Sequence, residues 1–388
     1  MGRMRRFLAL AVTAGFVVAA CGGTPASPSG AASVAPQSQA PQSSDAAPSA
    51  AAGLTPVRLQ LQWYPQAQFS GYFAAIEQGY YAAENLDVRW VSGGGTIAPQ
   101  TVGSQPDGPE FTIAWQPKVL QAREAGSDLV NIAQIFQRSG TLSVSWKDSN
   151  ITSPADFAGK KVGVWDFGNE FEVTAGAQKV GLEQGTDYTK VIQDFNMALL
   201  LSREIDVSEA MIYNEYAQVL ESTNPETGQL YQPTDLNVIN WNDEGTAMLQ
   251  DALFARAAWL AEPGNEDVAT RFLKASFQGW IYCRENPADC IQYTVNAGSQ
   301  LGAGHQAWMM NEINPLVWPS PAGIGMMDPT LWQQTADVSL DAAIITTAPP
   351  ADAYRTDLAE AALAELADAD TKGESFVKGT VEVTPGGN

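Results

Sequence analysis

The sequence predicts an α/β protein with parallel sheets, divided into two lobes. From residue 57 onward, strand-like stretches alternate with helix-like stretches at short intervals, a pattern typical of α/β folds. The chain beyond residue 53 also has about 335 residues, more than one typical hydrophobic core accommodates. The strand–helix pattern starts again near residue 153, so we expect a second lobe.

The first strand is predicted where Val57, Leu59, Leu61 and Trp63 alternate with polar residues. A helix is expected over 69–78, because the next residue, Gly79, suits a left-handed helix cap. Further along we expect strands over 86–90 and 111–115, a helix over 117–126 that begins at a tolerated proline, and apolar runs over 131–136 and 141–146.

In the second half we expect a short helix from 153, strands over 161–165 and 209–213, a helix over 215–223, a return strand near 250 that feeds a helix, mainly helix over 266–345, and a polar surface helix over 362–374. A chain that leaves one lobe near 145 and returns near 250 makes two crossings, which create a cleft with a hinge. The predicted first lobe comprises 54–145 and 250–345, the second 146–249, and a C-terminal extension 346–388.

The amino terminus predicts export. A basic start and the short apolar run 7–18 are typical of a signal peptide over 1–20. Residues 18–21, VAAC, resemble a bacterial lipobox, in which Cys21 is lipidated and anchors the protein on the extracytoplasmic face of the cell membrane. An ordinary signal peptide with an adjacent cysteine is the alternative. Residues 21–53 have too few apolar side chains to fold, so we expect a disordered tether.

Composition excludes several function classes. A net charge of -22 disfavours nucleic acid and anionic lipid surfaces, which bind clustered Lys and Arg. His305 is the sole histidine, so a multi-histidine metal site cannot form, and we expect this lone histidine to be a structural hydrogen-bonding group and not the base of a Ser-His-Asp triad. We therefore predict no catalytic residues, metal or cofactor, although a hydrolytic carboxylate pair or a purely structural envelope role stays open. Cys283 and Cys290 form either a disulfide or two buried thiols.

Four predicted strand–helix junctions each pair an aromatic side chain with a carboxamide. In open α/β sheets, ligands bind beyond the carboxyl ends of strands. Aromatic faces stack on planar ligands, and carboxamides donate and accept hydrogen bonds, although aromatic residues at strand ends can also simply cap a core. Few Lys or Arg residues stand there, so an anionic ligand is not expected. The candidate ligand-binding residues are Gln62, Trp63, Tyr64, Trp115, Gln116, Trp165, Phe167, Asn169, Glu170, Tyr213, Asn214 and Glu215.

Two stretches, WYPQAQFSGYFAAIEQGYYAAENLDV and SPADFAGKKVGVW, carry a resemblance to the extracytoplasmic substrate-binding proteins of ABC importers. The chain is most similar to the subgroup that binds thiamine pyrimidine precursors. The resemblance implies a two-lobed periplasmic-binding-protein fold of the second type, two crossover strands between the lobes, and a monomer. It also implies that the protein closes on a small heteroaromatic ligand and delivers it to a membrane permease and its ATPase.

One position departs from that subgroup. Pyrimidine binders tend to show Asp-Trp-Tyr-Pro where this chain has Gln62-Trp63-Tyr64-Pro65. A carboxylate accepts from an aminopyrimidine, whereas glutamine offers one donor and one acceptor, which complements the imide edge of riboflavin. The chain thus looks most like the riboflavin-binding members, and a thiamine pyrimidine precursor is the alternative ligand.

Overall fold

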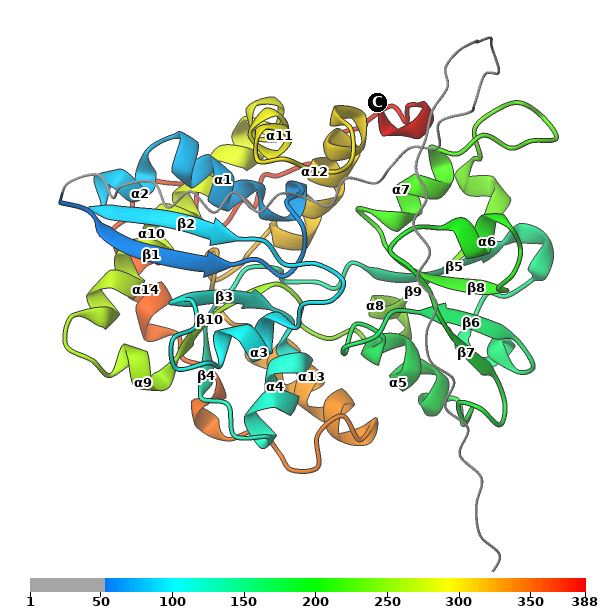
Figure 1. Ribbon diagram of the computed structural model, residues 1–388, viewed down its shortest axis with the longest axis horizontal. Helices are drawn as coiled ribbons and strands as arrows, with labels where there is room; N and C mark the ends of the chain where they lie inside the picture. Colours follow the sequence, from blue (N-terminus) through cyan, green and yellow to red (C-terminus); the bar gives the residue numbers. More distant parts are fainter. Residues whose placement is uncertain (1–52) are drawn as a thin grey trace, which may run out of the picture. The chain divides into compact units, whose positions relative to one another are not determined.

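The computed structural model describes residues 53–388, which form two five-stranded sheets with helices packed against them (Figure 1). The predicted signal peptide, Cys21 and all but the last residue of the predicted tether lie outside the described residues. None of the helices within 53–388 is long and apolar enough to cross a membrane.

Each sheet mixes parallel and antiparallel strands. The first sheet has the order β2-β1-β3-β10-β4, and the second has the order β7-β6-β8-β5-β9. The strands are β1 (Thr55–Gln60), β2 (Leu86–Val91), β3 (Phe111–Ala114), β4 (Leu129–Gln134), β5 (Thr141–Trp146), β6 (Lys161–Val164), β7 (Thr189–Ile192), β8 (Val207–Met211), β9 (Leu236–Asn240) and β10 (Ala252–Arg256).

The predicted α/β class with two lobes is confirmed, but the sheets are not purely parallel. β10 runs antiparallel to β3 and β4, and β5 runs antiparallel to β8 and β9. The reason is that these two strands follow the segments that cross between the sheets. The first crossing ends before Thr141, earlier than the expected boundary after residue 145, because all of β5 pairs within the second sheet.

Helices cover both sheets. They are α1 (Ser70–Glu77), α2 (Tyr80–Ala83), α3 (Pro99–Gly103), α4 (Gln116–Glu124), α5 (Phe171–Lys179), α6 (Ala198–Leu201), α7 (Glu215–Leu220), α8 (Trp241–Glu244), α9 (Ala257–Leu260), α10 (Asn265–Glu285), α11 (Pro287–Asn296), α12 (Ala303–Val317), α13 (Pro329–Asp341) and α14 (Asp357–Ala364). Gly79 takes φ +73 directly after the C-cap of α1, as predicted, since a left-handed residue closes a helix most easily as glycine.

The main core lies between the first sheet and α10. This helix buries Phe272, Phe277 and Trp280, and α1 crosses it at a pair of glycines. A Cβ added at Gly71 would collide with the Trp280 ring, and one at Gly279 would collide with the α1 backbone. The sequence therefore brings the two helices close together and fixes the start of α1, which follows directly on the predicted ligand-binding junction.

The segment predicted as a C-terminal extension packs against the first lobe. α14 buries Leu358, Ala359 and Ala362, which belong to the same hydrophobic cluster as the first sheet. The helix ends at Ala364, so the polar helix expected over 362–374 is wrong, because the apolar face that drives helix formation lies upstream. At the start of α11, Cys290 forms a disulfide bond with Cys283 of α10.

Candidate functional site

A small pocket lies where the strand ends of the two sheets face each other. We call it the inner pocket. Its volume is about 30 Å³, which holds one or two water molecules at roughly 10–15 Å³ each. Its lining residues come from both lobes, and aromatic rings and carboxamides predominate among them: Gln62, Trp63, Gln66, Gln68, Trp115, Trp165, Asn169, Phe195, Met211, Tyr213, Asn214 and Glu215.

A chain of hydrogen bonds fixes the first-lobe wall of this pocket. The indole Nε1 of Trp115 donates to Asp251 Oδ1 at 2.8 Å, and Gln68 Nε2 donates to Asp251 Oδ2 at 2.7 Å. Gln66 Nε2 in turn donates to Gln68 Oε1 at 2.6 Å. Burial raises the pKa of Asp251 to about 7, although the hydrogen bonds from Gln68 and Trp115 stabilise its charged form and oppose this shift. The wall is thus oriented before any ligand arrives, which limits the entropy cost of binding.

Two fully buried polar atoms of the pocket lining have no hydrogen-bond partner within residues 53–388. They are the acceptor Gln62 Oε1 and the donor Trp165 Nε1, both on side chains that are at least 95% buried. A buried polar group without a partner costs about 1–3 kcal/mol. A ligand that supplies one N–H donor and one acceptor would remove that cost, so the pocket wall favours a ligand with both.

The second-lobe wall is braced from behind by His305. Its Nε2 lies 3.0 Å from Asn214 Oδ1, and its Nδ1 lies 2.9 Å from Glu221 Oε1. Asn214 Nδ2 donates to Glu215 Oε1 at 3.0 Å, and burial raises the pKa of Glu215 to about 7. Because α12 carries the histidine, while Asn214 and Glu221 cap the two ends of α7, the ring links these two helices. The lone histidine therefore has a structural role within residues 53–388, as a hydrogen-bonding link between α7 and α12.

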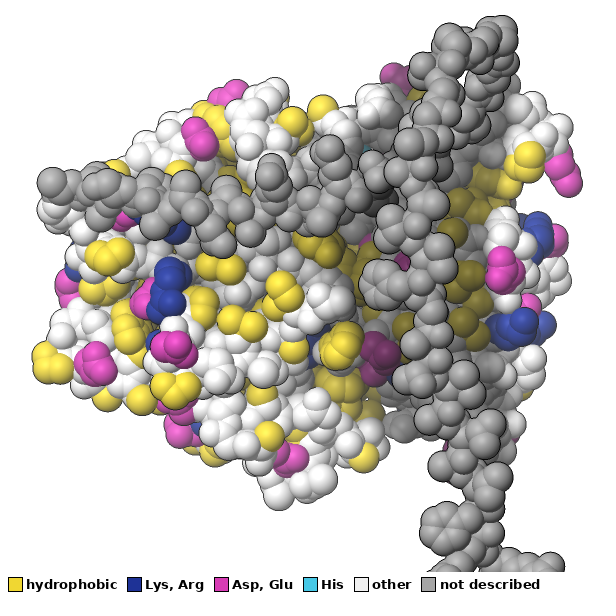
Figure 2. All heavy atoms as spheres, in the orientation of Figure 1, with side chains coloured by type: hydrophobic (Ala, Val, Ile, Leu, Met, Phe, Trp, Pro, Cys, Tyr) yellow, Lys and Arg dark blue, Asp and Glu magenta, His cyan; other side chains and the backbone are white. Residues whose placement is uncertain are grey.

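Acidic groups dominate the charge around the inner pocket. Burial lowers the pKa of Lys118 to about 7, although Asp251, Glu170 and Glu209 oppose this shift. Lys118 Nζ donates to Asn169 Oδ1 at 2.5 Å and lies 4.6 Å from the centre of the Trp115 ring. Lys118 thus joins α4 to the second lobe, and acidic side chains surround it, which disfavours an anionic ligand. Elsewhere, on the face in Figure 2, Lys and Arg side chains are scattered among acidic ones.

Most of the predicted site residues meet in the inner pocket. Those that line it are Gln62, Trp63, Trp115, Trp165, Asn169, Tyr213, Asn214 and Glu215. Tyr64 lines a neighbouring cavity of about 170 Å³, the outer cavity, instead. The outer cavity also contacts Trp63, Gln66, Phe195 and Asn214, so the two hollows share a wall.

Three predicted residues do not line either hollow. Gln116 is fully buried and accepts a hydrogen bond from Asn131 of β4 at 2.8 Å, so its side chain faces the sheet. Phe167 takes φ +63 and is 60% exposed. Glu170 accepts from the backbone N–H of Gly168 at 2.9 Å and lies 3.2 Å from Lys190, so it organises the turn before α5.

Residues 66–290 match the family described as NMT1/THI5 like. The chain belongs to the NMT1/THI5-like family. It is 26% identical over 352 residues to the riboflavin-binding protein RibY of Chloroflexus aurantiacus, covering 88% of this chain and 93% of that protein. It is also 26% identical over 243 residues to a formylaminopyrimidine-binding protein of Halalkalibacterium halodurans, covering 61% and 69%.

Solved structures place this family member among proteins with the periplasmic-binding-protein fold. The alkanesulfonate-binding protein SsuA of Xanthomonas axonopodis superimposes with a TM-score of 0.58 over 79% of this chain and all of that protein, at 16% identity. The desulfurization enzyme DSZB superimposes with a TM-score of 0.52 at 14% identity, over 80% and 99%. These likenesses confirm the predicted two-lobed fold.

Four residues that line the inner pocket were not predicted from the sequence. Gln66 and Gln68 stand in the same β1–α1 junction as Trp63, and counting carboxamides up to the first helical residue would have found them. Met211 is the last residue of β8, which ends two residues before the predicted end. Phe195 follows β7, an edge strand that the pattern analysis did not predict.

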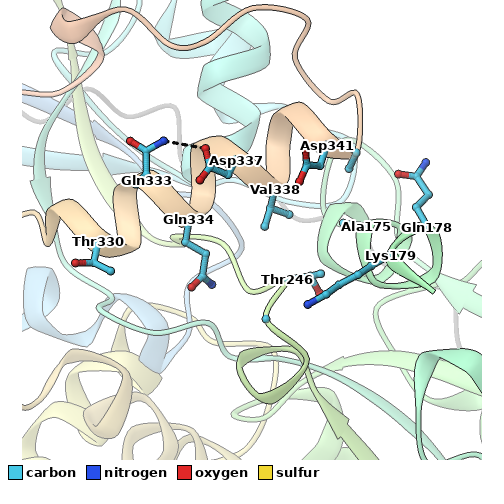
Figure 3. Close-up of a pocket in the computed structure, with 12 residues that line it drawn as sticks. Ala175, Gln178, Lys179, Thr246, Thr330, Gln333, Gln334, Asp337, Val338 and Asp341 are labelled. Carbon is cyan, nitrogen blue, oxygen red and sulfur yellow. Dashed lines mark hydrogen bonds between the residues drawn. The ribbon is translucent and has the colours of Figure 1, made fainter. Parts of the chain in front are cut away.

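A larger hollow of about 740 Å³ lies between α5 and α13 (Figure 3). There, Lys179 and Gln178 of α5 face a row of α13 side chains, in which Gln333 donates to Asp337 at 2.8 Å. No aromatic ring lines it, and none of its lining side chains within 53–388 has a buried atom without a partner. The described residues likewise contain no His, Cys, Asp and Glu group suited to a metal ion. The inner pocket is therefore the better candidate site.

Proposed function

We propose that this protein is the extracytoplasmic solute-binding component of an ABC importer and that it captures riboflavin in the cleft between its lobes. The observation that carries the proposal is the inner pocket itself, which three indoles and several carboxamides from both lobes line, and whose Gln62 Oε1 has no partner within residues 53–388. The similarity to RibY over most of both chains supports the same ligand. Lipidation at Cys21 and delivery to a permease complete the proposed role.

The chemistry of the pocket fits an isoalloxazine ring. The imide edge of that ring presents acceptor, donor and acceptor in sequence, and the amide of Gln62 can accept from the central N–H while it donates to a neighbouring carbonyl. Trp63, Trp115 and Trp165 offer faces for the ring system. Since the closed pocket is smaller than any aromatic ring, the ligand must enter while the cleft is open or by moving a side chain.

A thiamine pyrimidine precursor is the second candidate. One observation favours it: the buried carboxyl group of Glu215, which lines the inner pocket, could accept from an exocyclic amine. A relative that binds formylaminopyrimidine covers 61% of the chain. A hydrolytic role has less support, because the only histidine is buried against Glu221 and Asn214 and does not line the inner pocket.

A thermal-shift screen separates these candidates. The purified protein is heated with riboflavin, riboflavin phosphate, thiamine or formylaminopyrimidine, each at several concentrations. A ligand at one hundred times its Kd stabilises the folded state by about 2.7 kcal/mol. We expect riboflavin to raise the melting temperature most and its phosphate to act weakly, because carboxylates surround the cleft. A shift with formylaminopyrimidine alone would favour the second candidate, and no shift with any of them would contradict both.

A further inference from the structure

The ring of Phe195 lies against the two tryptophans that would stack on a flat ligand. Phe195 projects from the loop between β7 and α6 in the second lobe. Its ring centre is 3.9 Å from that of Trp63 in the first lobe, at an interplanar angle of 52°. It is 5.7 Å from that of Trp165, and these two rings are nearly parallel, at 14°. A protein side chain therefore makes the contacts that the ring of a ligand would make.

Phe195 also forms part of the wall between the two hollows of the cleft. It lines both the inner pocket of about 30 Å³ and the outer cavity of about 170 Å³. On another side it touches the Gly93-Gly94-Gly95 loop, where a Cβ on Gly95 would come within 2.6 Å of the Phe195 ring. The ring is thus packed from three directions, and its departure would join the two hollows into one.

The loop that carries Phe195 is held at its ends and is free in the middle. Gln193 donates from Nε2 to the backbone oxygen of Glu209 at 2.7 Å, and Met197 is buried. Between these anchors, the backbone groups of 194–196 make no hydrogen bond to another backbone group of residues 53–388. Phe195 itself is half-buried. Side-chain contacts alone hold the ring in place, so it can leave without unfolding either anchor.

We propose that Phe195 is a displaceable aromatic plug that occupies the ring-stacking position until a flat heteroaromatic ligand replaces it. The ligand ring then stacks on Trp165, and Phe195 moves outward and opens the inner pocket to the outer cavity. This inference rests on the proposed function only in assuming that the ligand is flat and aromatic. Phe195 therefore takes part in ligand selection, because a ligand binds only if it stacks on the tryptophans more strongly than the Phe195 ring does.

The test compares Phe195→Ala with the wild-type protein, using riboflavin and indole as probes in isothermal titration calorimetry. Phe195→Ala should bind riboflavin about tenfold more tightly, because the ligand no longer competes with an aromatic contact of roughly the strength measured for ring pairs. The same change leaves an apolar, ring-sized space beside two tryptophans, so the variant should also bind indole where the wild-type protein does not. Phe376→Ala removes a half-buried phenylalanine outside both hollows and should match wild type.

The two probes keep this inference separate from the proposed ligand. If riboflavin binds neither protein but indole binds Phe195→Ala, the vitamin is wrong and the plug is supported. If riboflavin binds the wild-type protein and Phe195→Ala weakens it, Phe195 is a stacking partner and the plug is overturned. Equal affinity of both proteins for both probes also overturns it. Circular dichroism checks folding, and Phe195→Leu replaces the alanine variant if that variant is unfolded.

Discussion

The backbone N–H of Met248 donates a hydrogen bond to Glu172 Oε1 at 3.0 Å. The other carboxylate oxygen of Glu172 accepts from Ser139 Oγ at 2.7 Å. Met248 and Ser139 lie in the two segments that connect the lobes, whereas Glu172 lies in the first turn of α5 in the second lobe. One buried carboxyl group therefore holds both crossings in register.

The position of Glu172 predicts that folding stability falls as pH rises. Burial raises the pKa of Glu172 to about 8, although Ser139, Met248 and Gln250 stabilise the charged form. A carboxyl group whose pKa is raised on folding stabilises the folded state fully below its unfolded pKa of about 4.3, and this contribution is lost as pH approaches 8. The slope is about 1.4 kcal/mol per pH unit and group. Urea unfolding at several pH values between 5 and 8 measures it.

Glu172→Gln supplies the matched control for that slope. The amide can accept from Met248 at Oε1 and donate to Ser139 from Nε2, so the hydrogen bonds are preserved without a titrating group. The variant should keep its stability at pH 5 and lose less of it by pH 8 than the wild-type protein does. Burial also raises the pKa values of Asp251 and Glu215 to about 7, so part of the slope should persist. An identical slope in both proteins would show that Glu172 does not titrate in this range.

Loss of the Cys283–Cys290 disulfide should lower stability without affecting the cleft. The bond joins α10 to α11 across Asn286 and Pro287, with a sequence separation of 7. Closing so short a loop in the unfolded chain stabilises the folded state by about 2 kcal/mol. We expect Cys283→Ala combined with Cys290→Ala to lose that amount in urea unfolding and to bind ligand normally. The wild-type protein under a reducing agent should behave in the same way, and unchanged stability in both cases would contradict the prediction.

Trp165→Ala should weaken binding of the ligand selectively. Trp165 is 2% exposed and lines the inner pocket, and its Nε1 lacks a partner within 53–388. Loss of one stacking face typically costs about 1–3 kcal/mol, which corresponds to a five- to 150-fold rise in Kd. Quenching of flavin fluorescence on titration measures this. Trp332→Ala, which removes a ring packed on Tyr354 away from the cleft, should bind as the wild-type protein does, and equal losses in both variants would point to a general folding defect.

The sequence predicted the parts of the site that lie at regular strand ends. Trp63, Trp115 and Trp165 follow buried strands with clear apolar patterns, so their place at the cleft could be derived from the general position of ligands in α/β sheets. Phe195 could not, because the four residues of β7 are at most half-buried, and so lack the buried apolar pattern that marks a strand.

Side-chain direction was the other limit. Gln116 stands directly after Trp115, yet Trp115 points to the pocket and Gln116 to Asn131. The chain turns from strand to helix between these two residues, and adjacent side chains at such a turn point to different sides. The direction of β10 could not be predicted from the sequence either. It runs antiparallel to β3 and β4 because the chain returns to the first sheet from the second lobe. Such features depend on tertiary connections that a local pattern does not contain.

Gln62→Glu should change which ligand the cleft prefers. The side chain is 4% exposed, lines the inner pocket, and leaves Oε1 without a partner within the described residues. Glutamate has nearly the same shape but only accepts when charged, so it can receive an imide N–H or an amine while it repels the adjacent carbonyl. Riboflavin should therefore bind about five- to 150-fold more weakly to this variant, since an unmatched buried polar group costs about 1–3 kcal/mol.

The opposite change is expected for an aminopyrimidine, because the pyrimidine binders that this chain resembles tend to carry an acid at this position. Formylaminopyrimidine should gain affinity for Gln62→Glu, and calorimetric titration of both ligands gives the ratio. Gln62→Met keeps the volume and removes both polar functions, so it should weaken riboflavin without favouring the pyrimidine. If the glutamate variant binds riboflavin as tightly as the wild-type protein does, Gln62 does not contact the ligand edge, and ligand choice must depend on the amides of Gln66, Asn169 or Asn214.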